Sequence, residues 1–496
     1  MPPLRVLLVD AYVFHRNPLS LAFLKAYADA KLDRRVEIRI LSACVADERM
    51  GASVVARAIA DFRPAVLGFS CYLWNVEPVV GLARRFRRKC RVVLGGPEAN
   101  GTGGAELLRR SGAHAVVVGE GEAAFAELLE RALRGKHWEG TPGTVNAPAR
   151  GLLPDIDAIP SPYLSGSIDL GDEEFLAFET QRGCPFRCAF CTWTTHGGVR
   201  TYAVPRLAKE LGYIAAQTSA KFMFLADADL FRDPGRAMKV LKLLRALPGR
   251  SLELIEVQTA LHHWSDALMR ECDFEGLAVA VGVESINPKA LKLAGRPDHT
   301  RLIEEKIVRF RKLAPKAQLW LQIICPLPGD TLADCKRLID WAWRQQPDAI
   351  MFFRLVVLPG SRFSAEAKSF GIERMPRAPH FVIRTRECGR KDVAELNQLM
   401  FWLDACYRDR RLREALTDAA RGGSVVEAFE AFMRGKAFFG RVWARSKKDY
   451  DAGRLFAPRR TCLAQEVADR LLRALSSSSR SSGKSPSARP WRRMGH

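Results

Sequence analysis

Three cysteines stand close together in the middle of the chain, at Cys184, Cys188 and Cys191. A strand-like run over residues 175–180 precedes them, so the cysteines fall on a loop that leaves a strand. A tight loop with the spacing Cys-x3-Cys-x2-Cys can wrap one iron–sulfur cubane and present three thiolates to three irons. The fourth iron then lacks a protein ligand and is free to bind a substrate or a cofactor.

Two other metal sites and a site without metal compete with this interpretation. Structural zinc usually needs four closed ligands in two separated pairs, and His196, five residues after Cys191, could supply a fourth. An electron-transfer ferredoxin needs a fourth cysteine nearby, but none follows until Cys272. Ordinary core cysteines are the remaining alternative. The spacing favours an iron–sulfur cluster with one open iron.

The cysteine triad resembles the cluster motif of the radical S-adenosylmethionine (SAM) superfamily. Phe190 occupies the position where that family keeps an aromatic residue. The resemblance implies a [4Fe-4S] cluster whose open iron is chelated by the amino and carboxylate groups of SAM. It further implies that one electron cleaves the sulfonium to give a 5′-deoxyadenosyl radical, while the protein orients and shields the reacting groups.

Six strand-like runs separated by helix-like stretches surround the triad. They cover residues 175–180, 222–226, 252–258, 278–283, 319–324 and 349–355. Six βα units are the partial TIM barrel that the resembling superfamily uses, and a barrel carries its functional groups at the C-terminal ends of its strands. Candidates at these ends are Asp227, Asp229, Gln258, Thr259, Glu284, Ser285 and Gln322.

The resemblance also suggests which side chains bind SAM. Glu284-Ser285 is similar to the segment that often binds the ribose or the amino acid part, and Asp227 lies where the family keeps its SAM-amino motif, although the sequence does not read Gly-Gly-Glu. A strand-end carboxylate that caps the next helix is the structural alternative. The expected SAM contacts are Phe190, Asp227, Gln258, Glu284, Ser285 and Gln322. No catalytic residue is assigned.

Residues 1–140 show a regular alternation of strands and helices. Apolar runs at 4–9, 36–41, 65–70, 92–94 and 115–118 predict a parallel sheet covered on both faces, as in flavodoxin-like, Rossmann-type domains. Such sheets bind ligands beyond the carboxyl ends of their strands. Glycines there let the backbone approach a large flat ligand, although each one could also be an ordinary turn. The residues at these ends are Ser70, Tyr72, Trp74, Asn75, Gly95, Gly96, Gly119 and Glu120.

A flavodoxin-like domain directly before a radical SAM barrel resembles the cobalamin-binding radical SAM class, over about residues 1–370. The strand-end residues of the first domain are then the expected cobalamin contacts. Many cobalamin domains carry Asp-x-His-x-x-Gly after the first strand, with the histidine as lower cobalt ligand. Here His15 is displaced relative to Asp10 and no glycine follows at the required distance. We therefore expect cobalamin bound without a histidine ligand.

The paired domains imply methyl transfer to an unactivated carbon as the reaction. A substrate radical would take the methyl group of methylcobalamin, and a second SAM would remethylate the cobalt. The alternatives are cyclisation, rearrangement or oxidation without methyl transfer, and then an RNA-modifying enzyme or a cobalamin-binding regulator. Expected partners are a small-molecule or peptide substrate and an external one-electron donor of the flavodoxin or ferredoxin type. The sequence does not identify the substrate.

Composition agrees with a globular chain. Of the 496 residues, 48% are hydrophobic and 27% are charged, which excludes a wholly disordered or collagen-like protein; the net charge is +22. No run of 18 apolar residues and no signal-like start is present, so we expect a cytoplasmic protein without a membrane span. We expect no nucleic-acid partner, because the first domain carries a small-molecule rim and no recognisable RNA-binding module. The basic run at 84–91 reads as a solvated helix end.

The expected fold class is thus α/β, with a C-terminal helical region. The predicted parts are a cobalamin-binding-like domain, a linker, a radical SAM core, a helical region and a disordered basic Ser-rich tail, over residues 1–140, 141–174, 175–385, 386–475 and 476–496. Helices are expected over 392–408, 412–420, 425–444 and 464–475. Aromatic residues in this region form either core or a substrate wall: Phe401, Trp402, Phe429, Phe432, Phe438 and Phe439. Trp193, Thr194 and His196 follow the triad and are candidates for a substrate pocket.

Overall fold

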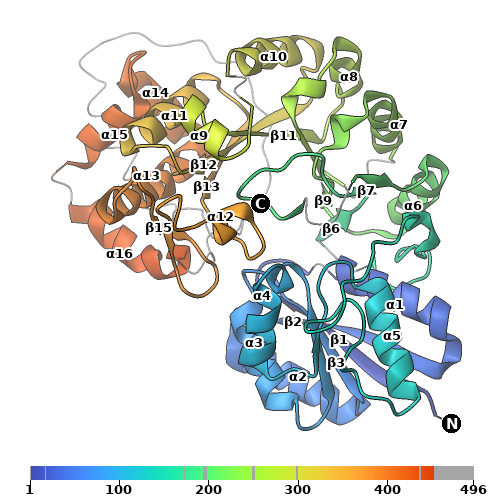
Figure 1. The fold of residues 1–496 in the computed structure, drawn as a ribbon. Coiled ribbons are helices and arrows are strands. Elements are labelled where there is room, and N and C mark those ends of the chain that lie inside the picture. Colours follow the sequence, from blue (N-terminus) through green and yellow to red (C-terminus); the bar gives the residue numbers. More distant parts are fainter. Residues whose placement is uncertain are drawn as a thin grey trace.

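The computed structural model describes residues 2–16, 18–171, 174–193, 198–247, 252–297, 300–434 and 437–451. Two parallel sheets organise them. Figure 1 shows the first sheet, in blue, below the second, with the C-terminal helices to one side. The expected α/β architecture is confirmed. Within the described residues, no helix combines the length and the apolar character that a membrane crossing requires.

The first sheet has the strand order β2-β1-β3-β4-β5, which is the flavodoxin-like order. Its strands are β1 (Leu4–Tyr12), β2 (Val36–Cys44), β3 (Val66–Ser70), β4 (Arg91–Gly95) and β5 (Ala115–Val116). Its helices are α1 (Leu19–Leu32), α2 (Glu48–Phe62), α3 (Val76–Phe86), α4 (Gly103–Ser111) and α5 (Glu122–Leu133). Val6 and Leu8 pack with α1 and α5, whereas Leu7 and Val9 pack with α2, α3 and α4. Both faces are covered, which explains why the strands are continuously apolar.

The second sheet has the order β13-β12-β11-β10-β9-β6, and all neighbours run parallel. β6 and β13 are its two edges, so the barrel is open. The strands are β6 (Phe175–Phe178), β9 (Phe222–Leu225), β10 (Leu254–Thr259), β11 (Leu277–Glu284), β12 (Gln318–Cys325) and β13 (Ala349–Arg354). The helices are α6 (Val204–Gln217), α7 (Pro234–Arg245), α8 (Asp266–Glu271), α9 (Pro288–Leu293), α10 (Thr300–Leu313), α11 (Leu332–Arg344) and α12 (Arg362–Ala365). The six predicted βα units are therefore present.

The alternation of side chains along the barrel strands separates an outer from an inner face. Leu319, Leu321 and Ile323 of β12 belong to the large core that the surrounding helices cover. Trp320 and Gln322 alternate with them and are less buried, so they point to the inside of the barrel. The same rule places Glu256 and Gln258 of β10 inside, because Ile255 and Val257 lie in the outer core.

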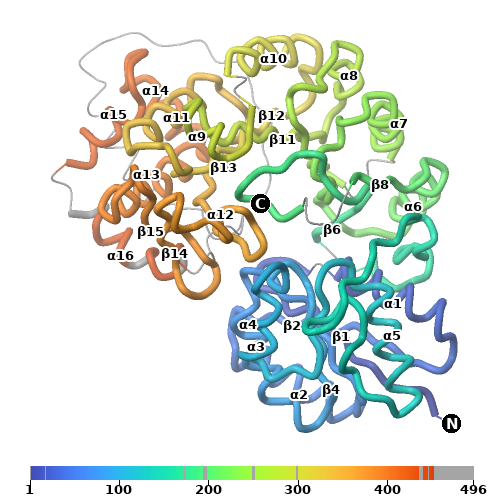
Figure 2. The backbone as a smooth tube through the Cα atoms, in the orientation of Figure 1, coloured from blue at the N-terminus to red at the C-terminus, as the bar shows by residue number. Residues whose placement is uncertain are grey.

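Short elements and a packed segment connect the domains. Two hairpins pair β7 (Gln181–Arg182) with β8 (Arg200–Thr201) and β14 (Glu373–Arg374) with β15 (Val382–Arg384). Single 3-10 turns lie at η1 (Asp33–Arg35), η2 (Pro97–Ala99), η3 (Ile156–Ala158), η5 (Leu230–Arg232) and η6 (Leu261–His263). Figure 2 shows the teal segment after α5 running from the first domain towards the barrel. Val145 N donates to Val116 O over 2.9 Å and the Tyr163 hydroxyl to Ala177 O over 2.6 Å, so this segment packs on both domains.

Four helices follow the barrel: α13 (Arg390–Arg408), α14 (Arg410–Ala420), α15 (Val425–Met433) and α16 (Ala437–Asp451). The single helix predicted over 425–444 is wrong. The chain leaves the helix at Arg434, whose ψ of 129° is extended, and the next residue in the sequence is glycine, a poor helix former. The predicted helix over 464–475 and the Ser-rich tail lie outside the described residues.

The aromatic residues of this region build core. Trp402 and Phe429 are fully buried in the core that includes the outer face of the barrel. Phe401 and Phe432 are partly buried and pack against the same core. The side chains of Phe438 and Phe439 lie outside the described residues. The packing of the four described rings needs no substrate to explain it.

Candidate functional site

The cysteine loop, residues 184–191, is held in place by two helices of the barrel. The backbone N–H of Ala189 donates to Ala294 O at the end of α9 over 2.8 Å, and Ala189 O accepts from Phe363 N of α12 over 2.9 Å. Gly295 has a positive φ of 70°, and a Cβ there would lie 3.0 Å from Arg187 O. The close approach of α9 to the loop therefore requires glycine at 295.

The donor set of this loop fits an iron–sulfur cubane. Cys188 is buried, and Cys184 and Cys191 are partly exposed. Within the described residues, no three His, Cys, Asp or Glu side chains are grouped to hold a single metal ion. Thiolates that bind different irons of one cube stand farther apart than the ligands of one ion. His196, the fourth ligand of the zinc alternative, lies outside the described residues.

Burial makes the three thiols poor acids on their own. It raises the pKa of the Cys184 thiol to about 11 and raises the pKa of Cys188 and Cys191 as well. Because a metal ligand must be a thiolate, loading a cluster here has to expel protons.

Arg296 lies beside the loop and was not predicted from the sequence. Its Nη1 donates to Cys188 Sγ over 3.8 Å, its Nη2 donates to Gly282 O over 2.5 Å, and the guanidinium stands 3.7 Å from Glu284 Oε1. Burial raises the pKa of Glu284, and the Arg296 charge opposes that effect. Glu284 also has a φ of 65°, a strained value for a residue other than glycine. Arg296 thus connects Glu284, the carboxylate expected to bind SAM, to the cysteine loop.

The two aspartates after β9 differ in what their carboxylates contact. Asp227 accepts from Thr180 N over 2.8 Å, from the Thr180 hydroxyl over 2.5 Å and from Gln181 N over 3.2 Å, so both of its oxygens are engaged at the exit of β6. Burial raises the pKa of Asp227 to about 7. This carboxylate orders the chain just before the cysteine loop.

Only one of the two carboxylate oxygens of Asp229 accepts hydrogen bonds among the described residues. Its Oδ1 accepts from the Thr259 hydroxyl and from Ala260 N, both over 3.1 Å. Its Oδ2 is buried without a hydrogen bond among the described residues, 3.7 Å from His263 Nε2. The Asp229 charge is close enough to Cys184 to help raise the pKa of that thiol. Of the two aspartates, Asp229 offers the acceptor beside the cysteine loop.

The other expected SAM contacts lie at the end of β11, on the inner face of the barrel strands and beside α9. Ser285 is buried next to Glu284, and its hydroxyl donates to Asp330 Oδ1 over 3.1 Å. Gln258 Nε2 donates to Glu256 Oε1 over 3.2 Å, and Gln322 Nε2 contacts Met351 Sδ over 3.7 Å, so these two amides lie on the inner strand face. Phe190 packs against a small core formed by α9 and the segment after β13.

Glu256 is a buried carboxylate that the sequence pattern did not predict as a site residue. Burial raises its pKa from 4.5 to about 7, against the hydrogen bond from Gln258. A carboxyl whose pKa is raised in the fold stabilises the protein below its ordinary pKa, and this contribution is lost as the pH rises towards 7.

Glu256→Gln should therefore stabilise the barrel above pH 7 by about 3 kcal/mol, and by little at pH 4. Thermal unfolding of the wild type and the variant at both pH values measures the difference. An equal gain at both values would contradict the raised pKa.

The ends of β3 and β4 form a rim built around glycine and stacked aromatic rings. Gly96 has a φ of 96°, and a Cβ there would lie 2.8 Å from the backbone of Cys71. Asn75 is buried and holds the rim: its Oδ1 accepts from Tyr72 N over 2.7 Å, and its Nδ2 donates to Ser70 O over 3.0 Å. The rings of Tyr72 and Trp74 stack 4.6 Å apart, and Trp74 is 42% exposed. The rim therefore presents a flat aromatic surface.

The end of β5 joins the rim to the cysteine loop. Gly119 has a φ of 80°, and Glu120 pairs with Arg200 of β8. Arg182, two residues before Cys184, stands 2.8 Å from Glu122 and 3.8 Å from Glu120. The segment that leads into the cysteine loop is thus paired with the expected cobalamin edge of the first domain.

A second contact fixes the rim to the end of the barrel. Arg374 Nη1 lies 2.7 Å from His380 Nδ1, and His380 Nε2 lies 3.1 Å from Glu98 Oε2. Because arginine can only donate, Nδ1 must accept and Nε2 must carry the proton that Glu98 accepts. Gly101 also packs on Gly360: a Cβ at Gly101 would lie 2.7 Å from the Gly360 Cα.

We expect His380→Ala to leave Glu98 buried without its donor and to lower the stability of the domain contact by about 1–3 kcal/mol. Thermal unfolding and limited proteolysis between residues 141 and 171 measure the effect. His137→Ala, at an exposed histidine, is the control. Equal behaviour of the two variants would show that the contact contributes nothing.

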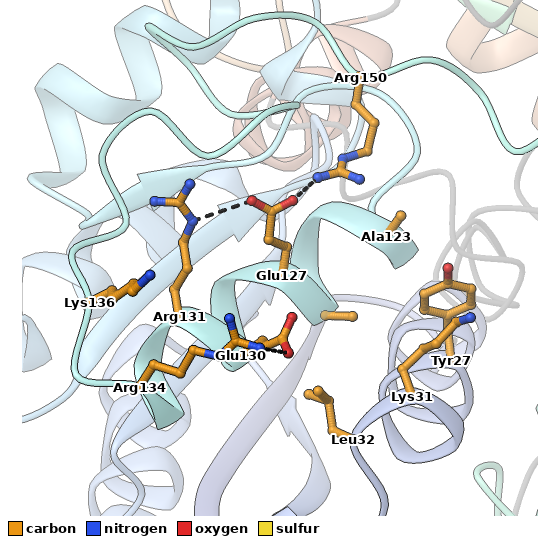
Figure 3. A pocket seen from close by; sticks show the side chains of 11 residues that line it. Tyr27, Lys31, Leu32, Ala123, Glu127, Glu130, Arg131, Arg134, Lys136 and Arg150 are labelled. Carbon is orange, nitrogen blue, oxygen red and sulfur yellow. Dashed lines mark hydrogen bonds and ion pairs between the residues drawn. The ribbon is translucent and has the colours of Figure 1, made fainter.

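His15 and one cleft of the first domain lie away from the cysteine loop. His15 stacks on Phe175 with ring centroids 5.3 Å apart, at the edge of the barrel. Trp193 stays beside the cysteine loop, where its backbone N–H donates to Cys191 Sγ over 3.4 Å, and it is 39% exposed; Thr194 and His196 lie outside the described residues. A cleft of about 470 Å³ between α1 and α5 holds no predicted residue, and Figure 3 shows its glutamates Glu127 and Glu130 paired with arginines. Its charges already neutralise one another in part.

Two family models match the chain. The model for the B12 binding domain matches residues 6–129, and the model for the radical SAM superfamily matches residues 178–342. The chain belongs to the cobalamin-dependent radical SAM enzymes. The first match covers the rim, and the second covers the cysteine loop and four of the six barrel strands, β9 to β12, so the resemblance seen in the sequence is confirmed.

Curated relatives of this family are mostly methyltransferases. The chain is 34% identical over 219 residues to 2-(S-pantetheinyl)-carbapenam-3-carboxylate methyltransferase of Streptantibioticus cattleyicolor, covering 40% of this chain and 31% of that protein. It is 29% identical to the cobalamin-dependent radical SAM methyltransferase TokK of Streptomyces tokunonensis, over 43% of this chain and 34% of that protein. An uncharacterized methyltransferase of Pyrococcus horikoshii is 24% identical over 70% of this chain and 77% of its own length. The chain thus spans about a third of the length of the first two.

Solved structures share the fold. The radical SAM methyltransferase TsrM of Kitasatospora setae, solved with cobalamin and a [4Fe-4S] cluster, superposes with a TM-score of 0.59 at 17% identity, over 75% of this chain and 76% of that one. The cobalamin-dependent SAM radical enzyme OxsB superposes with a TM-score of 0.64 at 12% identity, over 97% of this chain and 81% of that one. A [4Fe-4S] cluster, SAM and cobalamin are the cofactors typical of this family.

Proposed function

We propose that this radical SAM enzyme is a methyltransferase that places a methyl group on an unactivated carbon of a small molecule or peptide. The observation that carries the proposal is the ion pairing of Arg182, two residues before Cys184, with Glu120 and Glu122 after β5 of the first domain. Transfer between two cofactors requires that both reach one substrate, and a direct contact between their binding segments supports this. The methyltransferase names of the relatives agree with it.

When bound, the cluster with SAM supplies one-electron cleavage of a sulfonium, and cobalamin supplies a transferable methyl group. Cys184, Cys188 and Cys191 would hold the cluster. Arg296 would orient Cys188 together with Glu284 and balance the charge of the thiolate. The protein thereby fixes the reacting geometry before any substrate arrives.

For SAM, Asp229 is the better candidate for the α-amino group, because its Oδ2 lacks a hydrogen bond among the described residues whereas both oxygens of Asp227 are engaged. Glu284 and Ser285 remain the candidates for the ribose or the amino acid part. Phe190, Gln258 and Gln322 stay predicted contacts, the last two deeper on the inner face.

For cobalamin, the glycines Gly95, Gly96 and Gly119 would admit the flat ring, and the stacked pair Tyr72–Trp74 would cover part of it. Ser70 lines the same rim, where Asn75 acts through the backbone of the loop. Glu120 would act by joining the rim to the barrel rather than by direct contact. No histidine lower ligand is proposed.

The test is anaerobic reconstitution with iron, sulfide and cobalamin, followed by incubation with SAM and dithionite. We expect about four irons per chain, cobalamin absorbance that stays with the protein through gel filtration, and 5′-deoxyadenosine as a product. With the right substrate, S-adenosylhomocysteine should form as well. Protein that holds iron but no cobalamin would refute the methyl-transfer proposal. Substrate-dependent 5′-deoxyadenosine without S-adenosylhomocysteine would favour cyclisation, rearrangement or oxidation.

A further inference from the structure

The outer edge of the cysteine loop reaches the protein surface. Cys188 and Ala189 are buried, whereas Pro185 and Arg187 are exposed. Arg187 stands between two of the three cysteines that would bind the cluster. A positive charge is therefore displayed at the point where the cluster segment meets solvent.

The adjoining segment extends this positive surface. Gly295, which packs on the Arg187 backbone, is exposed, and so are Lys292 of α9 and Pro297. Among the described residues, neither Arg187 nor Lys292 forms an ion pair. We call Pro185, Arg187, Lys292, Gly295 and Pro297 the loop collar.

Among the described residues, two glutamates close to α9 or within α12 and its end pair with other cations and not with the collar. Glu387 pairs with Lys289 over 2.9 Å, and Glu366 pairs with Arg362 over 3.2 Å. Their charge is matched by other cations of α9 and α12. Within the part of the chain that the structure describes, the collar thus keeps two cations without an ion pair, beside exposed prolines and glycine, which have little side-chain entropy to lose on contact.

The inner side of the same loop serves a different purpose. Arg296 connects Cys188 to Gly282 and Glu284 at the end of β11, so this side faces the expected SAM contacts. The collar lies on the solvent side and is free for a macromolecule while the inner side holds SAM.

We propose that the loop collar is the docking surface for an acidic one-electron carrier protein of the flavodoxin or ferredoxin type. The inference rests on the proposed function, because only a cluster in this loop gives such a carrier something to reduce. In the step itself the carrier loses one electron and the cluster gains it, with no bond made or broken. Opposite charge steers short-lived encounters of this kind, whose interfaces are small.

The experiment compares two reductants on reconstituted full-length protein. Initial rates of 5′-deoxyadenosine formation are measured with dithionite and with increasing concentrations of an acidic flavodoxin in its hydroquinone form, at low and high ionic strength. The variants are Lys292→Glu and the double variant Arg187→Glu/Lys292→Glu. The matched control is Lys312→Glu, an exposed lysine at the end of α10, on the opposite end of the barrel from the strand exits.

We expect the flavodoxin KM to rise about tenfold in the double variant and by less in Lys292→Glu, with the dithionite rate unchanged in Lys292→Glu. Lys312→Glu should behave as the wild type, and salt should weaken the flavodoxin reaction of the wild type. An unchanged flavodoxin KM in both collar variants, while dithionite works, would overturn the docking surface alone. Absence of 5′-deoxyadenosine with dithionite in the wild type would overturn the proposed function and, with it, the docking surface.

Discussion

Cys188→Ser should leave a folded protein that no longer cleaves SAM. Cys188 is the most buried of the triad and receives the hydrogen bond from Arg296. Serine keeps the size and the hydrogen bond, but its alkoxide is a poor iron ligand. Replacing a residue that supports a metal ligand lowers metal affinity or activity by about 10–100-fold. Loss of a ligand itself should therefore lower 5′-deoxyadenosine formation by at least about 100-fold. Iron content and product formation after reconstitution measure the effect.

The matched control for this variant is Cys44→Ser, at a partly exposed cysteine of β2 outside the loop. It should retain iron and SAM cleavage. Cys184→Ser and Cys191→Ser should behave as Cys188→Ser does, because each thiolate would bind a different iron. Wild-type cleavage in any of the three would refute the cluster assignment.

Periodicity was enough to predict both sheets. The runs of apolar residues lie within or close to all five strands of the first domain and all six of the barrel, because parallel strands covered on both faces must be continuously apolar. Cysteine spacing located the loop for a similar reason: Cys184 to Cys191 form one local segment. The helix predicted over 425–444 failed because its apolar pattern continues across a point where the backbone turns at Arg434.

Contacts between distant segments could not be predicted from one sequence. Arg296 meets Cys188 across 108 residues, and His380 meets Glu98 across 282. Glu256 looks like any strand residue until the neighbouring strands bury it. No local pattern marks these side chains, since their partners are brought together only by the order of strands in the sheet.

The same limitation affected two residues that the sequence did single out. Glu120, a predicted cobalamin contact, also pairs with Arg200 across 80 residues, and its contact with cobalamin stays a prediction. Asp227 was preferred over Asp229 for SAM, yet it is Asp227 whose oxygens are both engaged. The residue type at a strand end predicts that a carboxylate is structurally or functionally important, but only its surrounding contacts indicate which role it has.

The largest expected effect on stability belongs to Arg182→Met. Arg182 is shared by both domains: its guanidinium lies 4.8 Å from the Phe23 ring of α1 and 3.0 Å from Glu179. It also pairs with Glu122 over 2.8 Å, and the Arg182 side chain is only 11% exposed. Removing one partner from a buried ion pair costs about 3–5 kcal/mol, because the remaining charges stay desolvated. We expect a thermal midpoint lower by about 10 °C and loss of cobalamin retention.

The dependence of this loss on pH distinguishes electrostatics from packing. Burial raises the pKa of Glu179, and Arg182 lowers it again, so removing Arg182 should raise this pKa further. A carboxyl with a raised pKa in the fold loses its stabilising protonated form as the pH increases. The penalty of Arg182→Met should therefore be larger at pH 8 than at pH 5, and Glu122→Gln added to it should recover part of the loss. Arg182→Lys should rescue only in part, since an ammonium cannot bridge several carboxylates as a planar guanidinium does. A penalty independent of pH and of Glu122 would mean that Arg182 acts through its packing on Phe23, and the electrostatic link between rim and cysteine loop would be wrong.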